Sequence, residues 1–314
     1  MKTMLLFLCL VFPILTFLEK TDILADNDNA ADLIILEPDK VDVPAAELGE
    51  GPCWDAETES LFWVDTPAAR VHRLSAAGVH SSWDVGKPAG AVVPRAGGGL
   101  VVAAGNGFLS LDPLTGTVGD LAAAPGQPGT RMNDGKCDRA GRFYAGTMAE
   151  DESPGRGSFY RLDTDHRVTE LYTGIGISNG IGWSPDDRLM YYTDSLAYRV
   201  DVLDYDPATG QMGERRPFAA LGSGEIMPDG LAVDAEGSVW VAVWGGSVIQ
   251  RYDSEGRLTG VVRVPVANVT SCAFGGPELD RLYITTAAGP GRSAGALFTC
   301  DCGVRGLPTF AYGG

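Results

Sequence analysis

The chain has 314 residues, with 24 Lys or Arg against 41 Asp or Glu, and a formal net charge of −17. So acidic a surface repels phosphate backbones, which excludes a general affinity for nucleic acid. Hydrophobic residues make up 45% of the chain, too many for a disordered protein. Its 42 glycines and 19 prolines favour many short elements, which argues against a helical bundle.

The first predicted element is an apolar leader. Lys2 precedes an apolar run over residues 4–18, which is shorter than the roughly 20 residues needed to span a bilayer and resembles the core of a signal peptide. No clear cleavage site follows, so an uncleaved anchor and a start codon placed too far upstream stay open. An exported or periplasmic protein is expected if the leader (1–18) is real, and a cytoplasmic one otherwise. Residues 19–40 are predicted to be a polar spacer, followed by one folded domain over 41–314.

A turn followed by a short β-rich run recurs within this domain. The intervals between turn starts are 40, 43, 47, 49 and 42 residues, and the turns begin at Asp55, Arg95, Asp138, Pro185, Asp234 and Gly276. Each unit has room for about four antiparallel strands, which is typical of a propeller blade. The pattern predicts an all-β, six-bladed β-propeller, with residues 41–48 as an outer strand that closes the ring onto the last blade. A β-sandwich with an added domain would not produce so even a spacing.

The repeat also predicts which polar side chains lie together. Five or six residues before each turn, the chain enters the innermost strand, and four of the six units have an oxygen-bearing side chain there: Glu50, Asn133, Asn179 and Asp229. The other two units have Gly90 and Ser271. Equivalent positions in a closed ring point to the same axis, so these groups are expected to converge at one mouth of the channel.

Two converging carboxylates repel each other unless a cation neutralises them. Glu50 and Asp229 with the Asn179 carbonyl form an all-oxygen set, which suits Ca²⁺, Mg²⁺ or Mn²⁺, and Zn²⁺ stays open. The competing interpretation is that Asn-Gly and Asp-Gly are ordinary turn dipeptides. Their coincidence at one phase of the repeat favours a binding site.

Four segments carry a family resemblance. LGEGPCWD (48–55), RMNDGKCDRAGRFYAGTM (131–148), SNGIGWSPD (178–186) and PDGLAVDAEG (228–237) are similar to motifs of the gluconolactonase/regucalcin family, also called senescence marker protein or luciferin-regenerating-enzyme-like. The resemblance covers about residues 41–310. It implies a six-bladed propeller with one divalent metal ion at a channel mouth, Ca²⁺ above all, that hydrolyses sugar lactones.

The resemblance also implies roles for particular residues. The metal ligands would be Glu50, Asn179 and Asp229, and Arg131 with Asn133 would hold the hydroxyls of the substrate. Asp151 occupies the position of an acidic substrate contact at which the family is expected to have Glu, so a shorter side chain there alters which sugar fits.

The resulting prediction is metal-dependent hydrolysis of a small sugar lactone such as gluconolactone. No obligate protein partner is expected. Asp229 is the candidate general base and a metal ligand at once. Two alternatives stay open: a regucalcin-type cation-binding protein without turnover, and a propeller esterase for other lactones or organophosphates. A match to G-x-S-x-G at residues 176–180 is rejected as a hydrolase elbow, because all three histidines precede Ser178 and a strand follows it.

Overall fold

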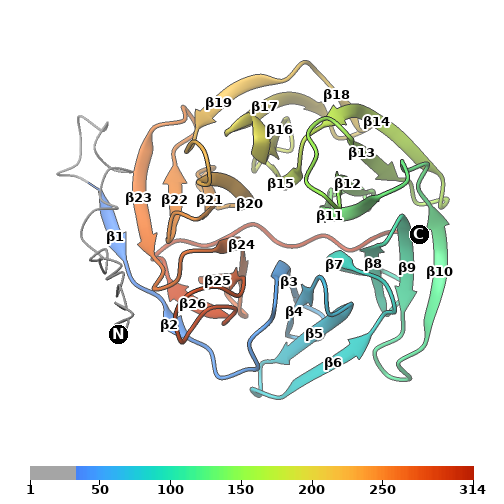
Figure 1. Cartoon of the computed structure of the whole chain (residues 1–314), viewed down its shortest axis with the longest axis horizontal. Coiled ribbons are helices and arrows are strands. Elements are labelled where there is room, and N and C mark those ends of the chain that lie inside the picture. The colour runs from blue at the N-terminus through green and yellow to red at the C-terminus, as the bar shows by residue number, and fades with distance from the viewer. Residues whose placement is uncertain (1–32) are drawn as a thin grey trace, which may run out of the picture.

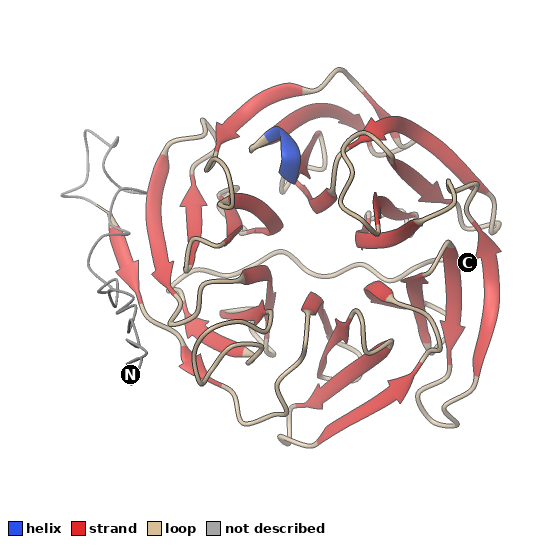
Figure 2. Ribbon diagram, viewed as in Figure 1, coloured by secondary structure: helices blue, strands red, loops and turns tan. Residues whose placement is uncertain are grey.

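The computed structural model describes residues 33–314, which form six β-sheets around a central axis (Figure 1). The predicted all-β, six-bladed propeller is confirmed. The one helix among the described residues is a short 3₁₀ turn, η3 (Ser195–Ala197), which follows β16 in blade four (Figure 2). No helix within residues 33–314 combines the length and the apolar character needed to cross a membrane.

Each blade consists of strands that run antiparallel from the axis outward. The innermost strands are β3 (Gly49–Asp55), β7 (Ala89–Pro94), β11 (Thr130–Cys137), β15 (Ser178–Trp183), β20 (Met227–Val233) and β24 (Val269–Gly275). The second strands are β4 (Ser60–Asp65), β8 (Leu100–Ala104), β12 (Phe143–Ala149), β16 (Leu189–Asp194), β21 (Val239–Trp244) and β25 (Arg281–Thr286). The third strands are β5 (Arg70–Ser75), β9 (Gly107–Leu111), β13 (Gly157–Leu162), β17 (Arg199–Asp206), β22 (Val248–Tyr252) and β26 (Phe298–Asp301). The outer strands are β6 (His80–Asp84), β10 (Val118–Ala123), β14 (Val168–Ile175), β18 (Gln211–Met212) with β19 (Arg216–Ala220), β23 (Leu258–Arg263) and β2 (Asp39–Lys40).

The core lies between the blades. Strands such as β8 and β21 are continuous apolar runs because adjacent blades cover both of their faces. Tyr144 and Phe159 of blade three, for example, pack with Ile181 and Met190 of blade four. The outer strands are only partly buried, as the mixed exposure along β14 shows. Burial between neighbours therefore holds the ring of blades together.

Ring closure differs in detail from the prediction. The strand that completes blade six is β2, which pairs with β26 and lies just before the predicted segment 41–48. A further strand, β1 (Ile34–Leu36), pairs in parallel with β23 at the edge of blade five. Strand pairing thus begins inside the segment predicted to be a spacer, because strands of two or three residues are too short to show the period of a β-strand. The predicted leader, residues 1–18, lies outside the described residues.

The last twelve residues, 303–314, cross the axis and are here named the C-terminal strap (Figure 1). Gly306 N donates to Leu279 O at 2.7 Å and Leu307 N to Val233 O at 3.3 Å, which ties the strap to blades six and five. Tyr312 N donates to Pro94 O at 2.8 Å and so ties it to blade two on the other side.

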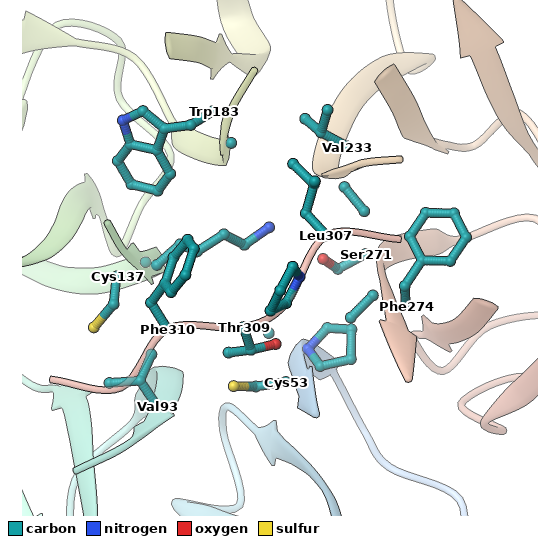
Figure 3. Close-up of a pocket in the computed structure, with 18 of the residues that line it drawn as sticks. Cys53, Val93, Cys137, Trp183, Val233, Ser271, Phe274, Leu307, Thr309 and Phe310 are labelled. Carbon is teal, nitrogen blue, oxygen red and sulfur yellow. The ribbon is translucent and has the colours of Figure 1, made fainter. Parts of the chain in front are cut away.

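These contacts involve the ends of the innermost strands, whereas the predicted ligands lie near the strand starts. The strap therefore covers the channel at the end opposite the predicted site. A cavity of about 80 Å³ lies beneath it, lined by Cys53 and Cys137 together with strap residues 307–310. Figure 3 shows Leu307, Thr309 and Phe310 of the strap crossing this space.

Candidate cation and substrate site

The predicted site residues lie within strands, at β-bulges. Every innermost strand has a register shift against its second strand, and the shifts in β3, β15 and β20 fall between Glu50 and Cys53, between Asn179 and Ile181, and between Pro228 and Leu231. The interpretation of these segments as turn dipeptides is therefore wrong. A bulge inserts an unpaired residue that re-aims its neighbours, which frees these side chains from strict alternation.

The glycines that follow the site residues allow the innermost strands to approach one another. A Cβ on Gly180 would lie 2.7 Å from the carbonyl oxygen of Asp229, and a Cβ on Gly230 would lie 2.0 Å from Ser271 Oγ. Both distances are too short for any side chain. Glycine after Asn179 and Asp229 thus reflects crowding at the axis, whereas Gly51 after Glu50 has a φ of +53°, which favours glycine.

A chain of hydrogen bonds joins three blades at this mouth. Arg131 Nη1 donates to Asn133 Oδ1 at 2.8 Å, and Asn133 Nδ2 donates to Asn179 Oδ1 at 3.0 Å. Asn179 Nδ2 in turn donates to Ser195 Oγ at 2.8 Å, and that hydroxyl donates to Pro228 O at 2.7 Å, next to Asp229. The structure therefore brings Arg131, Asn133 and Asn179 together. Ser195 was not predicted, and no motif in the sequence marks it.

Three buried carboxylates influence one another inside the channel. Burial raises the pKa of Glu50 to about 8, and the negative charge of Asp134 contributes to the rise. Burial and the charge of Glu50 raise the pKa of Asp229 well above its ordinary value. Burial also raises the pKa of Asp134, which follows Asn133 in a quoted motif but was given no role by the sequence analysis. Each is less than a tenth exposed.

The residues present fit a hard cation. Asp229 Oδ1 is buried and has no hydrogen-bond partner among the described residues, so one carboxylate oxygen is left without a donor and is free to bind a cation. Because the Asn179 amide nitrogen is held by Ser195, its carbonyl oxygen is turned toward Asn133 and the mouth. In residues 33–314 no three His, Cys, Asp or Glu side chains cluster closely enough to hold a metal. This finding does not test the predicted ligand set, which consists of two acids, Glu50 and Asp229, and the amide of Asn179.

Arg131 and Asp151 differ in where they lie. Burial lowers the pKa of the Arg131 guanidinium, and the charges of Glu50, Glu152, Glu150 and Asp229 oppose that effect. The Asp151 side chain is 65% exposed, lies 3.8 Å from Arg156 and accepts a hydrogen bond from Ser153 N at 3.1 Å. The structure does not bring Asp151 to the other site residues, so its substrate contact stays a prediction.

The carboxylate environment predicts an unusual pH dependence of stability in the cation-free protein. Glu50 has a pKa of 4.5 as a model group and about 8 when folded, so its contribution is fully present below pH 4.5 and is lost as pH rises toward 8. At about 1.4 kcal/mol per tenfold change in proton affinity, the loss is at most about 5 kcal/mol. Urea unfolding with a chelator, from about pH 5 to about pH 8, measures it.

The matched control is Glu50→Gln, which cannot titrate and should flatten this part of the profile. An added divalent ion should restore the stability of the wild-type protein at the alkaline end. A wild-type profile parallel to that of Glu50→Gln would contradict the assignment of Glu50 to a repulsive cluster.

The fold and the site together define the class: a six-bladed propeller with converging oxygen donors at one channel mouth. The chain matches the model of the SMP-30/Gluconolactonase/LRE-like region over residues 48–288. It belongs to this family, as the resemblance implied.

Individual relatives agree with this assignment. Regucalcin of Danio rerio is 38% identical over 281 residues, which cover 85% of this chain and 95% of the relative. A solved luciferin-regenerating enzyme has a TM-score of 0.82 at 32% identity, covering 88% of this chain and 99% of that one. A calcium-binding protein, regucalcin, from Agrobacterium tumefaciens has a TM-score of 0.84 at 28% identity and covers 89% and 98%. The family names thus join lactonases with calcium-binding proteins.

Proposed function

We propose that the chain is a divalent-cation-dependent lactonase that hydrolyses a small sugar lactone such as gluconolactone. The observation that carries the proposal is the buried Asp229 Oδ1, which has no hydrogen-bond donor in the described part of the chain and lies at a mouth with Glu50, Asn179 and Arg131. The family assignment supports the same reaction class. Ca²⁺ is the expected ion, and Mg²⁺, Mn²⁺ and Zn²⁺ are the alternatives.

Glu50, Asn179 and Asp229 would hold the cation. When bound, a divalent cation polarises a lactone carbonyl and offsets the negative charge of the tetrahedral oxyanion. Asp229 Oδ1 accepts the proton of the attacking water, since no donor from residues 33–314 occupies that oxygen. The ring C–O bond then breaks, and the same carboxyl returns the proton to the leaving oxygen, which gives the open-chain acid.

Arg131 and Asn133 have different roles in orienting the substrate. Only the Nη1 nitrogen of Arg131 has acceptors among the described residues, Asn133 Oδ1 and Met132 O, so Nε and Nη2 are available to substrate hydroxyls. Asn133 Nδ2 already donates to Ser178 O and Asn179 Oδ1. Asn133 therefore orients Arg131 and Asn179, and its own substrate contact is limited to the second lone pair of Oδ1. Asp151 is the proposed further hydroxyl contact.

The test is hydrolysis of glucono-, xylono- and arabinonolactone, followed with a pH indicator before and after chelation. Removal of the cation is expected to lower the rate by about 10²-fold or more, and one of Ca²⁺, Mg²⁺, Mn²⁺ or Zn²⁺ should restore it. Aryl esters and an organophosphate in the same panel test the esterase alternative. Absence of metal-restored activity on every lactone would overturn the proposal.

The second candidate is cation binding without turnover, which the regucalcin relatives favour. It requires the same three ligands but no role for Arg131 at the mouth. Calorimetric titration with Ca²⁺ distinguishes the two, since stoichiometric binding combined with no lactone hydrolysis would support this candidate alone.

A further inference from the structure

A groove of about 690 Å³ lies at the same end of the propeller as the predicted cation ligands. Its walls come from the β8–β9 turn and the end of β10 in blade two, and from the start of β11 in blade three. The residues that matter here are Lys87, Asn106, Asp120, Ala123, Arg131 and Glu150. Because all innermost strands start at this end, the groove opens beside the mouth and away from the C-terminal strap.

Arg131 joins the groove to the site. Its side chain lines the groove, while its Nη1 nitrogen donates to Asn133 at the mouth. A ligand that is bound at the mouth and contacts the remaining guanidinium nitrogens can therefore extend into the groove. Neither the motifs nor the repeat pointed to this space.

The chemistry of the groove suits a neutral polar ligand. The charged side chains that line the groove are two positive and two negative ones: Lys87 and Arg131, Asp120 and Glu150. Lys87 Nζ and Asp120 Oδ1 form an ion pair at 2.9 Å, so the charges of the lining balance. No net charge is left to select an ionic group. Ala123 and the neighbouring small residues of β10 add an apolar wall. A sugar ring matches this lining, because its hydroxyl groups can hydrogen-bond to the polar side chains and its C–H bonds can pack against the alanines.

The size of the groove points to more than one ring. Pockets of about 300–1,000 Å³ bury drug-sized ligands, which are larger than a single aldonolactone. With a lactone ring at the mouth, a second ring attached to it would occupy the groove.

We propose that this groove is a subsite for a neutral glycosyl group, so that the preferred substrate is a glycosyl-substituted aldonolactone, derived from a disaccharide. The inference rests on the proposed lactonase function. The class of reaction that would supply such a substrate is oxidation of the reducing end of a disaccharide.

The test compares cellobiono-1,5-lactone with glucono-1,5-lactone in the wild-type protein and in Ala123→Trp. The wild-type kcat/KM is expected to be about tenfold or more higher for the disaccharide lactone, equivalent to about 1.4 kcal/mol of extra binding in the transition state. Ala123 is exposed, so tryptophan should fill the groove without disturbing the fold, which a melting curve verifies. Ala123→Trp should remove the preference and leave the glucono-lactone rate unchanged, and Ala123→Ser is the matched control.

A second measurement separates failure of the subsite from failure of the proposed function. Cellobiitol, which has no lactone, is titrated by calorimetry into the cation-loaded protein, with an expected loss of affinity of about tenfold in Ala123→Trp. Equal wild-type kcat/KM for the two lactones, or a preference that survives Ala123→Trp, would overturn the subsite. If no lactone is hydrolysed, the proposed function fails. The subsite is then supported if Ala123→Trp weakens cellobiitol binding and is overturned if it does not.

Discussion

Replacement of Asp229 with asparagine is expected to lower lactone turnover by about 10²- to 10⁴-fold, the usual contribution of a general base. Asparagine keeps an oxygen at the mouth but cannot take a proton from water. The measurement is kcat at a saturating concentration of the restoring cation, so that a weakened ion affinity does not enter the result. A loss in kcat with little change in KM would assign Asp229 to the proton-transfer step.

The matched control is Asp204→Asn, the same chemical change at an exposed carboxylate that pairs with Arg216 on an outer strand. It should leave turnover unchanged. The cation-free Asp229→Asn protein should also be more stable than the cation-free wild type near neutral pH, because the substitution removes one of the mutually repelling acids. Near-normal turnover in Asp229→Asn would remove this residue from the mechanism.

Deletion of the C-terminal strap, residues 303–314, is expected to open the far end of the channel to solvent. Cys53 and Cys137 line the cavity beneath the strap and are at most 6% exposed. Burial raises the pKa of the Cys53 thiol to about 12, which suppresses the reactive thiolate. Release of that burial should raise its rate of reaction with an aromatic disulfide reagent near pH 8 on the order of 10³-fold.

Cys53→Ala in the shortened chain identifies the reacting thiol, and circular dichroism verifies that the blades persist. Tyr312→Ala is a milder variant, because it keeps the strap and removes one fully buried ring between blades two and three together with its hydroxyl, which donates to Asp163 O at 2.8 Å. It should increase thiol reactivity by a smaller factor. Unchanged reactivity of Cys53 in a folded, strapless protein would show that the strap does not close the channel.

Much of the architecture could be predicted from the sequence, because each blade repeats the same pattern of strands and turns. Apolar runs of strand length followed by turns recur at a nearly constant interval, and burial between blades requires those runs in every unit. The phase of the repeat also predicted that Glu50, Asn133, Asn179 and Asp229 lie at one mouth. The motif that spans the third turn contained Asp134, but the burial of this residue depends on neighbours from other blades and cannot be predicted from the local sequence.

Other features come from contacts between segments far apart in the chain. The closing strand β2 and the strand β1 are too short to show periodicity, and they exist because edges in blades six and five accept their hydrogen bonds. Asp151 lies in solvent, where Ser153 N donates to it and Arg156 lies 3.8 Å away, although the resemblance implied a substrate contact at this position. The amino-acid order thus determined which groups recur and in which phase. Folding of the ring determined which of them meet, because burial, shared hydrogen bonds and charge repulsion arise between residues that are neighbours in space alone.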